Sequence, residues 1–270
     1  MQSHHGGMGR VITASGDTIG VDEAGSGNAA PIVFLHGVGS DKSVWAPQLA
    51  HFGATRRAVA FDYPGYGESD PAAAGATRDD FAAAILAAMD ALGIGRAHVC
   101  GLSLGGVIAI AMSAAAPQRC ASLILADSFA VHPEGQAIYE RSIAASADMR
   151  ALAEGRADAL LAQPADAAVR SEVIETMARI DPAAFCIGAQ AVWLADQRDR
   201  VAAIGTPTLI ICGTEDRITP PALSEELASI IPGARCKRIE HAGHLTNLEC
   251  PAEFNDLVGA FLSREESRSV

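Results

Sequence analysis

The chain has 270 residues, of which 49% are hydrophobic and 19% charged. Such a composition excludes a disordered chain, and the length allows a large core. Lys and Arg number 20 against 32 Asp and Glu, a formal net charge of −12. A net negative field argues against nucleic acid and anionic membrane surfaces as partners.

The first ten residues lack the apolar segment of a secretory signal, and we expect residues 1–10 to form a flexible tail. No apolar run reaches the roughly 20 residues that span a bilayer. The six cysteines include no C-x-x-C pair, which argues against a zinc knuckle or a redox motif. We therefore expect a cytoplasmic protein with reduced thiols and no bound metal.

Short apolar runs alternate with longer helical patterns along the chain. The runs suit strands buried between two helical layers, and they cover residues 31–36, 57–62, 98–100, 123–126 and 208–212. The helical patterns cover residues 77–92, 104–116, 220–231 and 251–262. The first of these begins at Thr77, a favourable N-cap, followed by Asp79 and Asp80. This alternation predicts an α/β fold with a mostly parallel central sheet flanked by helices.

The alternation stops between residues 131 and 200. This stretch has no strand-like run, and its apolar residues recur at the spacing of several short helices. About 70 residues are too many for an ordinary connection between two strands. We therefore predict a helical cap over 131–200, inserted into a core formed by 11–130 and 201–265.

The strongest local signal is the hexapeptide GLSLGG at residues 101–106, which contains G-x-S-x-G. It directly follows an apolar run and directly precedes a helical pattern, the context that a nucleophile elbow requires. A sharp strand-to-helix turn would expose the Ser103 hydroxyl at the carboxyl end of the strand. The amides at the start of the helix would then face the negative charge that develops during acyl transfer.

A serine nucleophile needs a base, and the base needs a carboxylate. His244 follows the run 235–240 and precedes the final helical pattern, so it can reach the carboxyl edge of the sheet. Asp216 follows the buried run 208–212, and Asp127 is its rival because it also follows a strand after Ser103. The motif context favours Asp216.

An oxyanion hole needs backbone amides. Leu104 follows the nucleophile and supplies one of them. The turn HGVG at residues 36–39 follows the run 31–36, and Val38 is the best candidate for the second donor.

In this order along the chain, the motifs resemble those of the α/β-hydrolase superfamily. The resemblance extends from residue 11 to 262 and includes the segment DYPGYGES at 62–69, GTED at 213–216 and HAGH at 241–244. Within the superfamily the chain most resembles the carboxylesterases similar to 3-oxoadipate enol-lactonase. The resemblance implies Ser103 as nucleophile, His244 as general base and acid, and Asp216 as the residue that orients His244.

The resemblance implies a hydrolase that cleaves a small carboxylic ester or lactone through an acyl-enzyme, without a cofactor. Ser103 stands where haloalkane dehalogenases and epoxide hydrolases have Asp, and Leu102 stands where ring-fission C–C hydrolases tend to have Asn. C–C bond hydrolysis and cofactor-free perhydrolase or haloperoxidase activity remain alternatives on this scaffold. A noncatalytic ligand receptor on a hydrolase fold is an alternative of another class. The sequence leaves open whether the chain forms a homodimer.

The substrate pocket should lie between the sheet edge and the cap. Aromatic candidates for its lining, each as well suited to a core role, are Trp45, Phe129, Tyr139, Phe185 and Trp193. A carboxylated substrate would need one cap arginine facing the pocket. The sequence does not single one out among residues 141, 150, 156, 170, 179, 198 and 200.

Overall fold

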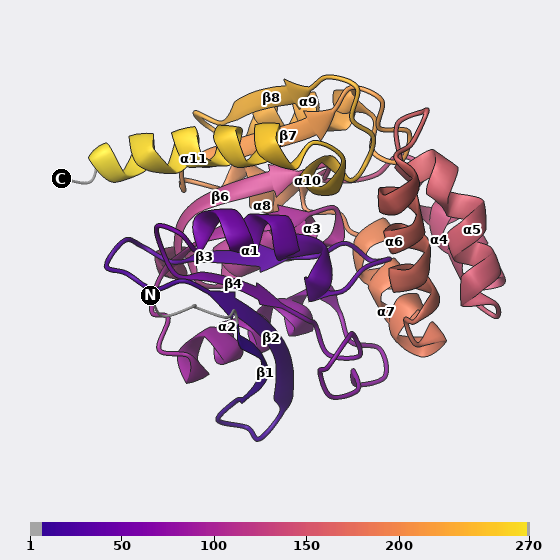
Figure 1. Ribbon diagram of the computed structural model, residues 1–270, viewed down its shortest axis with the longest axis horizontal. Helices are drawn as coiled ribbons and strands as arrows, with labels where there is room; N and C mark the ends of the chain where they lie inside the picture. Colours follow the sequence, from indigo (N-terminus) through magenta and orange to yellow (C-terminus); the bar gives the residue numbers. More distant parts are fainter. Residues whose placement is uncertain (1–6, 269–270) are drawn as a thin grey trace.

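A computed structural model describes residues 7–268 and centres on one twisted eight-stranded sheet (Figure 1). The strand order is β1-β2-β4-β3-β5-β6-β7-β8. The six strands from β4 to β8 are parallel, and β1 and β2 are added antiparallel at one edge. The strands are β1 (Gly7–Ile12), β2 (Thr18–Ala24), β3 (Ile32–Leu35), β4 (Ala58–Phe61), β5 (Ala97–Leu102), β6 (Cys120–Ala126), β7 (Thr208–Gly213) and β8 (Arg235–Ile239).

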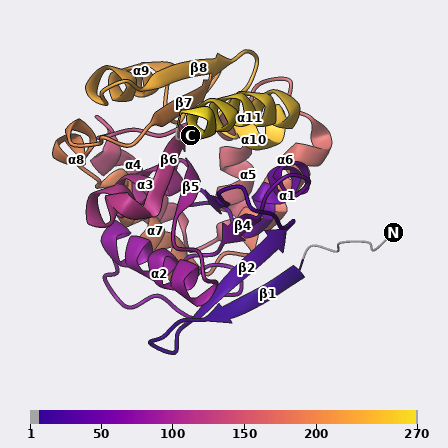
Figure 2. The ribbon, with the colours of Figure 1, turned by 90° about the vertical axis from the view of Figure 1, so that its left-hand side faces the viewer.

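Helices cover both faces of the sheet, as the apolar character of its central strands requires. Helices α1 (Ala46–Phe52) and α11 (Pro251–Ser267) lie on one face, and the other carries α2 (Arg78–Ala91), α3 (Leu104–Ala115), α8 (Arg198–Ala202) and α9 (Pro221–Ile230) (Figure 2). Short helical turns are η1 (Lys42–Trp45), η2 (Pro117–Arg119) and α10 (Thr246–Glu249). The mostly parallel central sheet flanked by helices, predicted from the sequence, is confirmed.

Four helices connect β6 to the short helix α8 that precedes β7. They are α4 (Gly135–Ala145), α5 (Met149–Leu160), α6 (Ala167–Ala178) and α7 (Pro182–Trp193). The arrows of β6 and β7 in Figure 1 point toward this group, so it lies beyond the carboxyl ends of the parallel strands. None of the helices in residues 7–268 is long and apolar enough to cross a membrane.

The N-terminal tail predicted over residues 1–10 overlaps the first strand by four residues. Residues 7–10 belong to β1, because their backbone pairs with β2 from Gly7 opposite Glu23 onward. The expected tail residues 1–6 lie outside the described residues. The final helix is longer than predicted and continues to Ser267, where Glu266 in its last turn forms an ion pair with Arg56.

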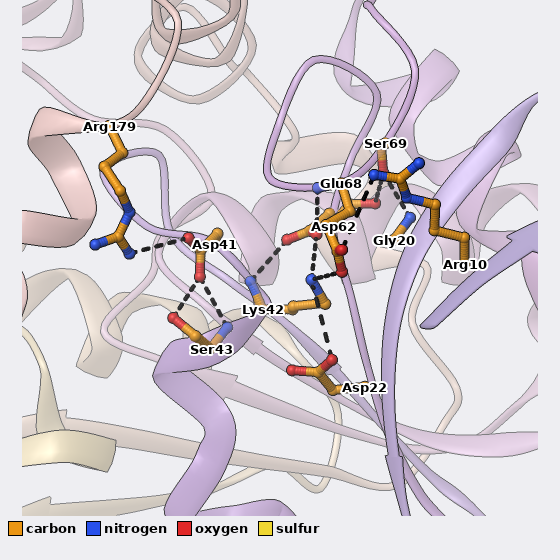
Figure 3. Close-up of polar contacts among 10 residues, drawn as sticks. All are labelled: Arg10, Gly20, Asp22, Asp41, Lys42, Ser43, Asp62, Glu68, Ser69 and Arg179. Atoms are coloured by element: carbon orange, nitrogen blue, oxygen red, sulfur yellow. Dashed lines mark hydrogen bonds and ion pairs between the residues drawn. The ribbon is translucent and has the colours of Figure 1, made fainter. Parts of the chain in front are cut away.

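A buried charge cluster joins the turn after β3 to the end of β4 (Figure 3). The Lys42 ammonium lies 2.9 Å from Asp62 Oδ2 and 2.8 Å from Glu68 Oε2, and the Lys42 backbone N–H donates to Asp62 Oδ1. Burial acts against the ammonium, but the hydrogen bonds to Glu68 and Asp62 outweigh it and raise the pKa of Lys42. The cluster fixes the segment that carries residues 36–41.

We expect Lys42→Met to lower the free energy of unfolding by about 3–5 kcal/mol, because it leaves the buried Asp62 carboxylate without its cation. Urea denaturation followed by circular dichroism measures the change. Arg10→Met is the control. Its guanidinium is exposed and lies 4.0 Å from Glu68, so its loss should cost about 1 kcal/mol or less. Equal losses in both variants would contradict the role of the Lys42–Asp62 pair.

Candidate active site

Ser103 lies in the tight turn between β5 and α3. Its φ of 54° and ψ of −113° fall where a residue with a side chain is rarely found. The turn closes because residue 101 has no side chain: a Cβ on Gly101 would lie 2.1 Å from the carbonyl oxygen of Gly105. The Ser103 N–H donates to the carbonyl of Ala126 at 2.9 Å, which fixes the turn to β6.

His244 and Asp216 meet at the same edge of the sheet. The His244 Nδ1 lies 2.8 Å from Asp216 Oδ2, and Thr219 Oγ1 donates to the same oxygen at 2.6 Å. The other carboxylate oxygen accepts the backbone N–H groups of Ile218 and Thr219. Burial alone would raise the pKa of Asp216, but His244 and these hydrogen bonds outweigh it and lower the pKa. The carboxylate is therefore ionised at neutral pH.

Asp127 lies nearby without reaching the imidazole. Its Oδ1 accepts the N–H of Gly213 at 2.9 Å, and its Oδ2 accepts the hydroxyl of Thr246 at 2.6 Å. Burial, with a further contribution from Asp216, raises the pKa of Asp127 well above its usual value. Asp127 thus ties the end of β7 to the start of α10, and Asp216 is the carboxylate that contacts His244.

Sequence reasoning missed a carboxylate that holds the His244 loop. Glu249 accepts the backbone N–H groups of Gly243 and Leu245 on either side of His244, and that of Ala162 after α5. The His244 N–H in turn donates to the carbonyl of Leu160 at 2.8 Å. An acid five residues after the histidine was the available signal, but its backbone partners arise only from tertiary structure.

The turn after β3 lies against the serine. A Cβ on Gly37 would be 3.6 Å from the Cβ of Ser103. The His36 carbonyl accepts the Tyr63 hydroxyl at 3.0 Å, and its Nδ1 donates to the Gly37 carbonyl at 2.8 Å. Burial lowers the pKa of His36, so its ring is neutral and structural.

The two amides expected to form an oxyanion hole are unengaged. Within residues 7–268, neither the Val38 N–H nor the Leu104 N–H donates to a protein acceptor. Leu104 is the first residue of α3, where an N–H has no partner inside the helix. Both groups are therefore free to bind an oxygen atom that develops negative charge.

A small cavity of about 20 Å³ contains the serine and the histidine. Its lining includes Ser103, His244, Val38, Met177 and Trp193. Ser103 and His244 are only 2% and 3% exposed, so the site is shielded from bulk water. A separate cavity of about 850 Å³ lies between α4, α5 and residues 217–223.

The aromatic residues expected to line the pocket have different locations. Trp193 lines the small cavity, where Phe129 stacks behind it with ring centroids 5.9 Å apart. Trp45 is fully buried and stacks on Phe34 at 4.9 Å, so it packs in the core and lines neither cavity described above. Tyr139 is partly buried against the core and also lines neither of them. Trp45, Phe129 and Tyr139 therefore do not line the cavity that holds Ser103 and His244.

Among the described residues, no group of three or more His, Cys, Asp or Glu side chains is arranged to hold a metal ion.

Known proteins that are similar to this chain include several hydrolases. The profile of the Alpha/beta hydrolase family matches residues 32–257. A 3-oxoadipate enol-lactonase from Acinetobacter baylyi is 29% identical over 93% of this chain and 96% of its own length. A 2-hydroxymuconate semialdehyde hydrolase from Pseudomonas is 31% identical over 97% of this chain and 96% of its own length.

Among solved structures, the enol-lactonase from Burkholderia xenovorans superimposes with a TM-score of 0.87 at 28% identity. The match covers 94% of this chain and all of that one. The residues from β3 to α11 that build the site lie within the matched family region. The chain therefore belongs to the α/β-hydrolase family.

Proposed function

We propose that the protein is a serine hydrolase that cleaves a small carboxylic ester or lactone through an acyl-enzyme. One observation carries this proposal: His244, held 2.8 Å from the Asp216 carboxylate, lines the same cavity as Ser103 on its strained turn. A hydroxyl, an oriented imidazole and two unengaged amides are the groups that acyl transfer needs.

The reaction begins when His244 Nε2 takes the proton of the Ser103 hydroxyl as Ser103 Oγ attacks the carbonyl carbon. The Val38 and Leu104 amides hold the oxyanion of the tetrahedral intermediate. The C–O bond to the leaving group then breaks, and His244 gives its proton to the departing alkoxide. Asp216 keeps the Nδ1 proton of His244 in place and stabilises the imidazolium that forms.

Water completes the cycle. His244 takes a proton from water, whose oxygen attacks the acyl carbon, and the collapsing intermediate releases Ser103 and the acid. With a lactone the alcohol stays attached to the acyl group, so a single ring-opened acid leaves. We also propose that residues 131–200 act as a cap, because Met177 and Trp193 from this segment line the small cavity.

The similarity to known relatives supports cleavage of a C–O bond, and it leaves C–C bond hydrolysis as an alternative. The similarity to two enol-lactonases favours a lactone or ester substrate. The similarity to a 2-hydroxymuconate semialdehyde hydrolase keeps C–C bond hydrolysis as the second candidate. Both reactions could use the same serine, so comparison of their substrates must separate them.

A fluorophosphonate probe tests the proposal directly. We expect one equivalent of the probe to bind covalently to the peptide that contains Ser103. Turnover of 4-nitrophenyl acetate should fall in proportion to the fraction of protein that is labelled. The probe should label neither heat-denatured protein nor Ser103→Ala. The values of kcat/KM for a ring-fission dienoate and for a set of lactones then show whether the enzyme cleaves a C–C or a C–O bond. An unlabelled Ser103, or no turnover of any ester or lactone, contradicts the proposal. If the dienoate is not turned over either, the result favours a receptor.

A further inference from the structure

The arginines between residues 131 and 200 divide into two groups. Five of the seven form ion pairs, and these are Arg150 with Glu175, Arg170 with Asp158, Arg179 with Asp41, Arg198 with Asp196, and Arg200 with Asp79. Among the described residues, Arg141 and Arg156 have no carboxylate partner. Both guanidiniums are therefore available to an anion that the protein itself does not supply.

These two arginines line the same cavity, the one of about 850 Å³. Arg217 lines it as well, and its side chain donates to the backbone carbonyl of Asp158 at 3.3 Å. Glu134 is the one acid among the lining residues. The cavity therefore offers an excess of positive charge to an occupant.

Arg156 is the most desolvated of the three. It is partly buried, and its Nη1 donates a long hydrogen bond of 3.4 Å to Ser142 Oγ. Burial, together with the nearby Arg141, lowers the pKa of Arg156. A guanidinium has five N–H donors and stays charged in proteins. Most N–H groups of Arg156 therefore have no hydrogen-bond acceptor within residues 7–268. A partly buried guanidinium without a carboxylate partner is energetically unfavourable. An anion bound here would supply the missing ion pair.

Arg156 also connects this cavity to the reacting groups. It lines the large cavity on one side and the small cavity of Ser103 and His244 on the other. An anionic group held by Arg156 would therefore lie next to an ester or lactone positioned at Ser103.

We propose that the substrate carries an oxyanion, a carboxylate or a phosphate, on its non-reacting part, and that Arg156 binds it with Arg141 and Arg217 lining the space beyond. This assignment rests on the proposed function and defines its substrate class. A guanidinium fork pairs with either oxyanion through two parallel hydrogen bonds.

Matched substrates test the proposal. 4-Acetoxybenzoate, 4-acetoxyphenyl phosphate and methyl 4-acetoxybenzoate share one reacting acetyl group and place a carboxylate, a phosphate or a neutral ester on the alcohol side. Mono-4-nitrophenyl adipate and its methyl ester make the same comparison on the acyl side. We expect the native enzyme to prefer an anionic substrate over its neutral analogue in at least one set. The preferred substrate then shows which oxyanion is bound and whether it lies on the alcohol side or the acyl side of the ester.

Variants assign that preference to Arg156. Arg156→Gln should lower the anionic-to-neutral ratio of kcat/KM about tenfold or more, mainly through KM. Arg156→Lys keeps the charge without the fork and should retain part of the ratio. Arg150→Gln removes an arginine of the same helix that is paired with Glu175 outside both cavities, and should leave the ratio unchanged.

Binding gives a readout that does not depend on turnover. In Ser103→Ala, the preferred anionic substrate should bind by calorimetry, and adding Arg156→Gln should weaken it about tenfold or more. No anionic preference in either set, or an equal ratio in Arg156→Gln, would overturn the assignment. Ester turnover without anionic preference overturns this inference alone. Anion binding dependent on Arg156, with no turnover of any substrate, would instead contradict the hydrolase function.

Discussion

Ser103→Ala and Ser103→Gly should both lower kcat about 10⁶-fold, because each removes the nucleophile from a group of residues that act together. The residual rate would come from binding and from the Val38 and Leu104 amides. Turnover of 4-nitrophenyl acetate at saturating substrate measures the loss. Activity in either variant above about one hundredth of the native rate would exclude Ser103 as the nucleophile.

The same two variants should differ in stability. The φ of 54° and ψ of −113° at Ser103 cost a residue with a Cβ about 1–3 kcal/mol. Glycine is free of that strain but gains about 0.5–1 kcal/mol of conformational freedom in the unfolded chain. We therefore expect Ser103→Gly to be more stable than Ser103→Ala by about 1 kcal/mol, measured by urea denaturation.

Ser128 provides the matched control. It is buried beside the elbow, its hydroxyl donates to the Ser103 carbonyl at 3.0 Å, and its φ is not positive. At this position Gly relieves no strain, so Ser128→Gly should be less stable than Ser128→Ala. If Gly were also the less stable substitution at residue 103, the elbow would not store strain.

The sequence predicted the parts of the site that depend on local backbone geometry. A strand followed by Gly-x-Ser-x-Gly and a helix permits few conformations, and the structure forms the turn around Gly101 and Ser103. The choice of Asp216 over Asp127 as the partner of His244 came from the motif context, since both residues follow a strand. In parallel sheets the carboxyl ends of strands meet at one edge, so residues distant in the chain converge there.

The lining of the cavities could not be predicted in this way. Trp45 and Trp193 look alike in sequence, yet one stacks in the core and the other lines the small cavity. Arg150 and Arg156 lie on the same helix, and only the packing of α5 against its neighbours gives Arg150 an acid and Arg156 none. The edge strands β1 and β2 were also missed, because β2 mixes buried and half-buried residues and lacks a continuous apolar run.

Asp216→Asn should lower kcat about 10⁴-fold while the protein stays folded, because an amide at this position favours the wrong tautomer of His244. Asp127→Asn should change kcat by less than about tenfold, since Asp127 contacts Gly213 and Thr246 and does not contact His244. The pair of substitutions is matched in chemistry, burial and location. A large loss in Asp127→Asn with a small one in Asp216→Asn would reverse the assignment of the carboxylates.

Stability against pH separates the two carboxyls independently of catalysis. The folded-state pKa of Asp127 is raised above its unfolded value of about 3.9, so the folded protein holds this proton more tightly. Its contribution is complete below about pH 4 and is lost as the pH rises toward the raised pKa. Asp127→Asn should remove this part of the loss of stability above about pH 4. Asp216, whose pKa is lowered, contributes with the opposite sign: its contribution is present above about pH 4 and is lost as the pH falls below that. Asp216→Asn should therefore reduce the loss of stability on the acid side of about pH 4 and leave the slope at higher pH nearly unchanged.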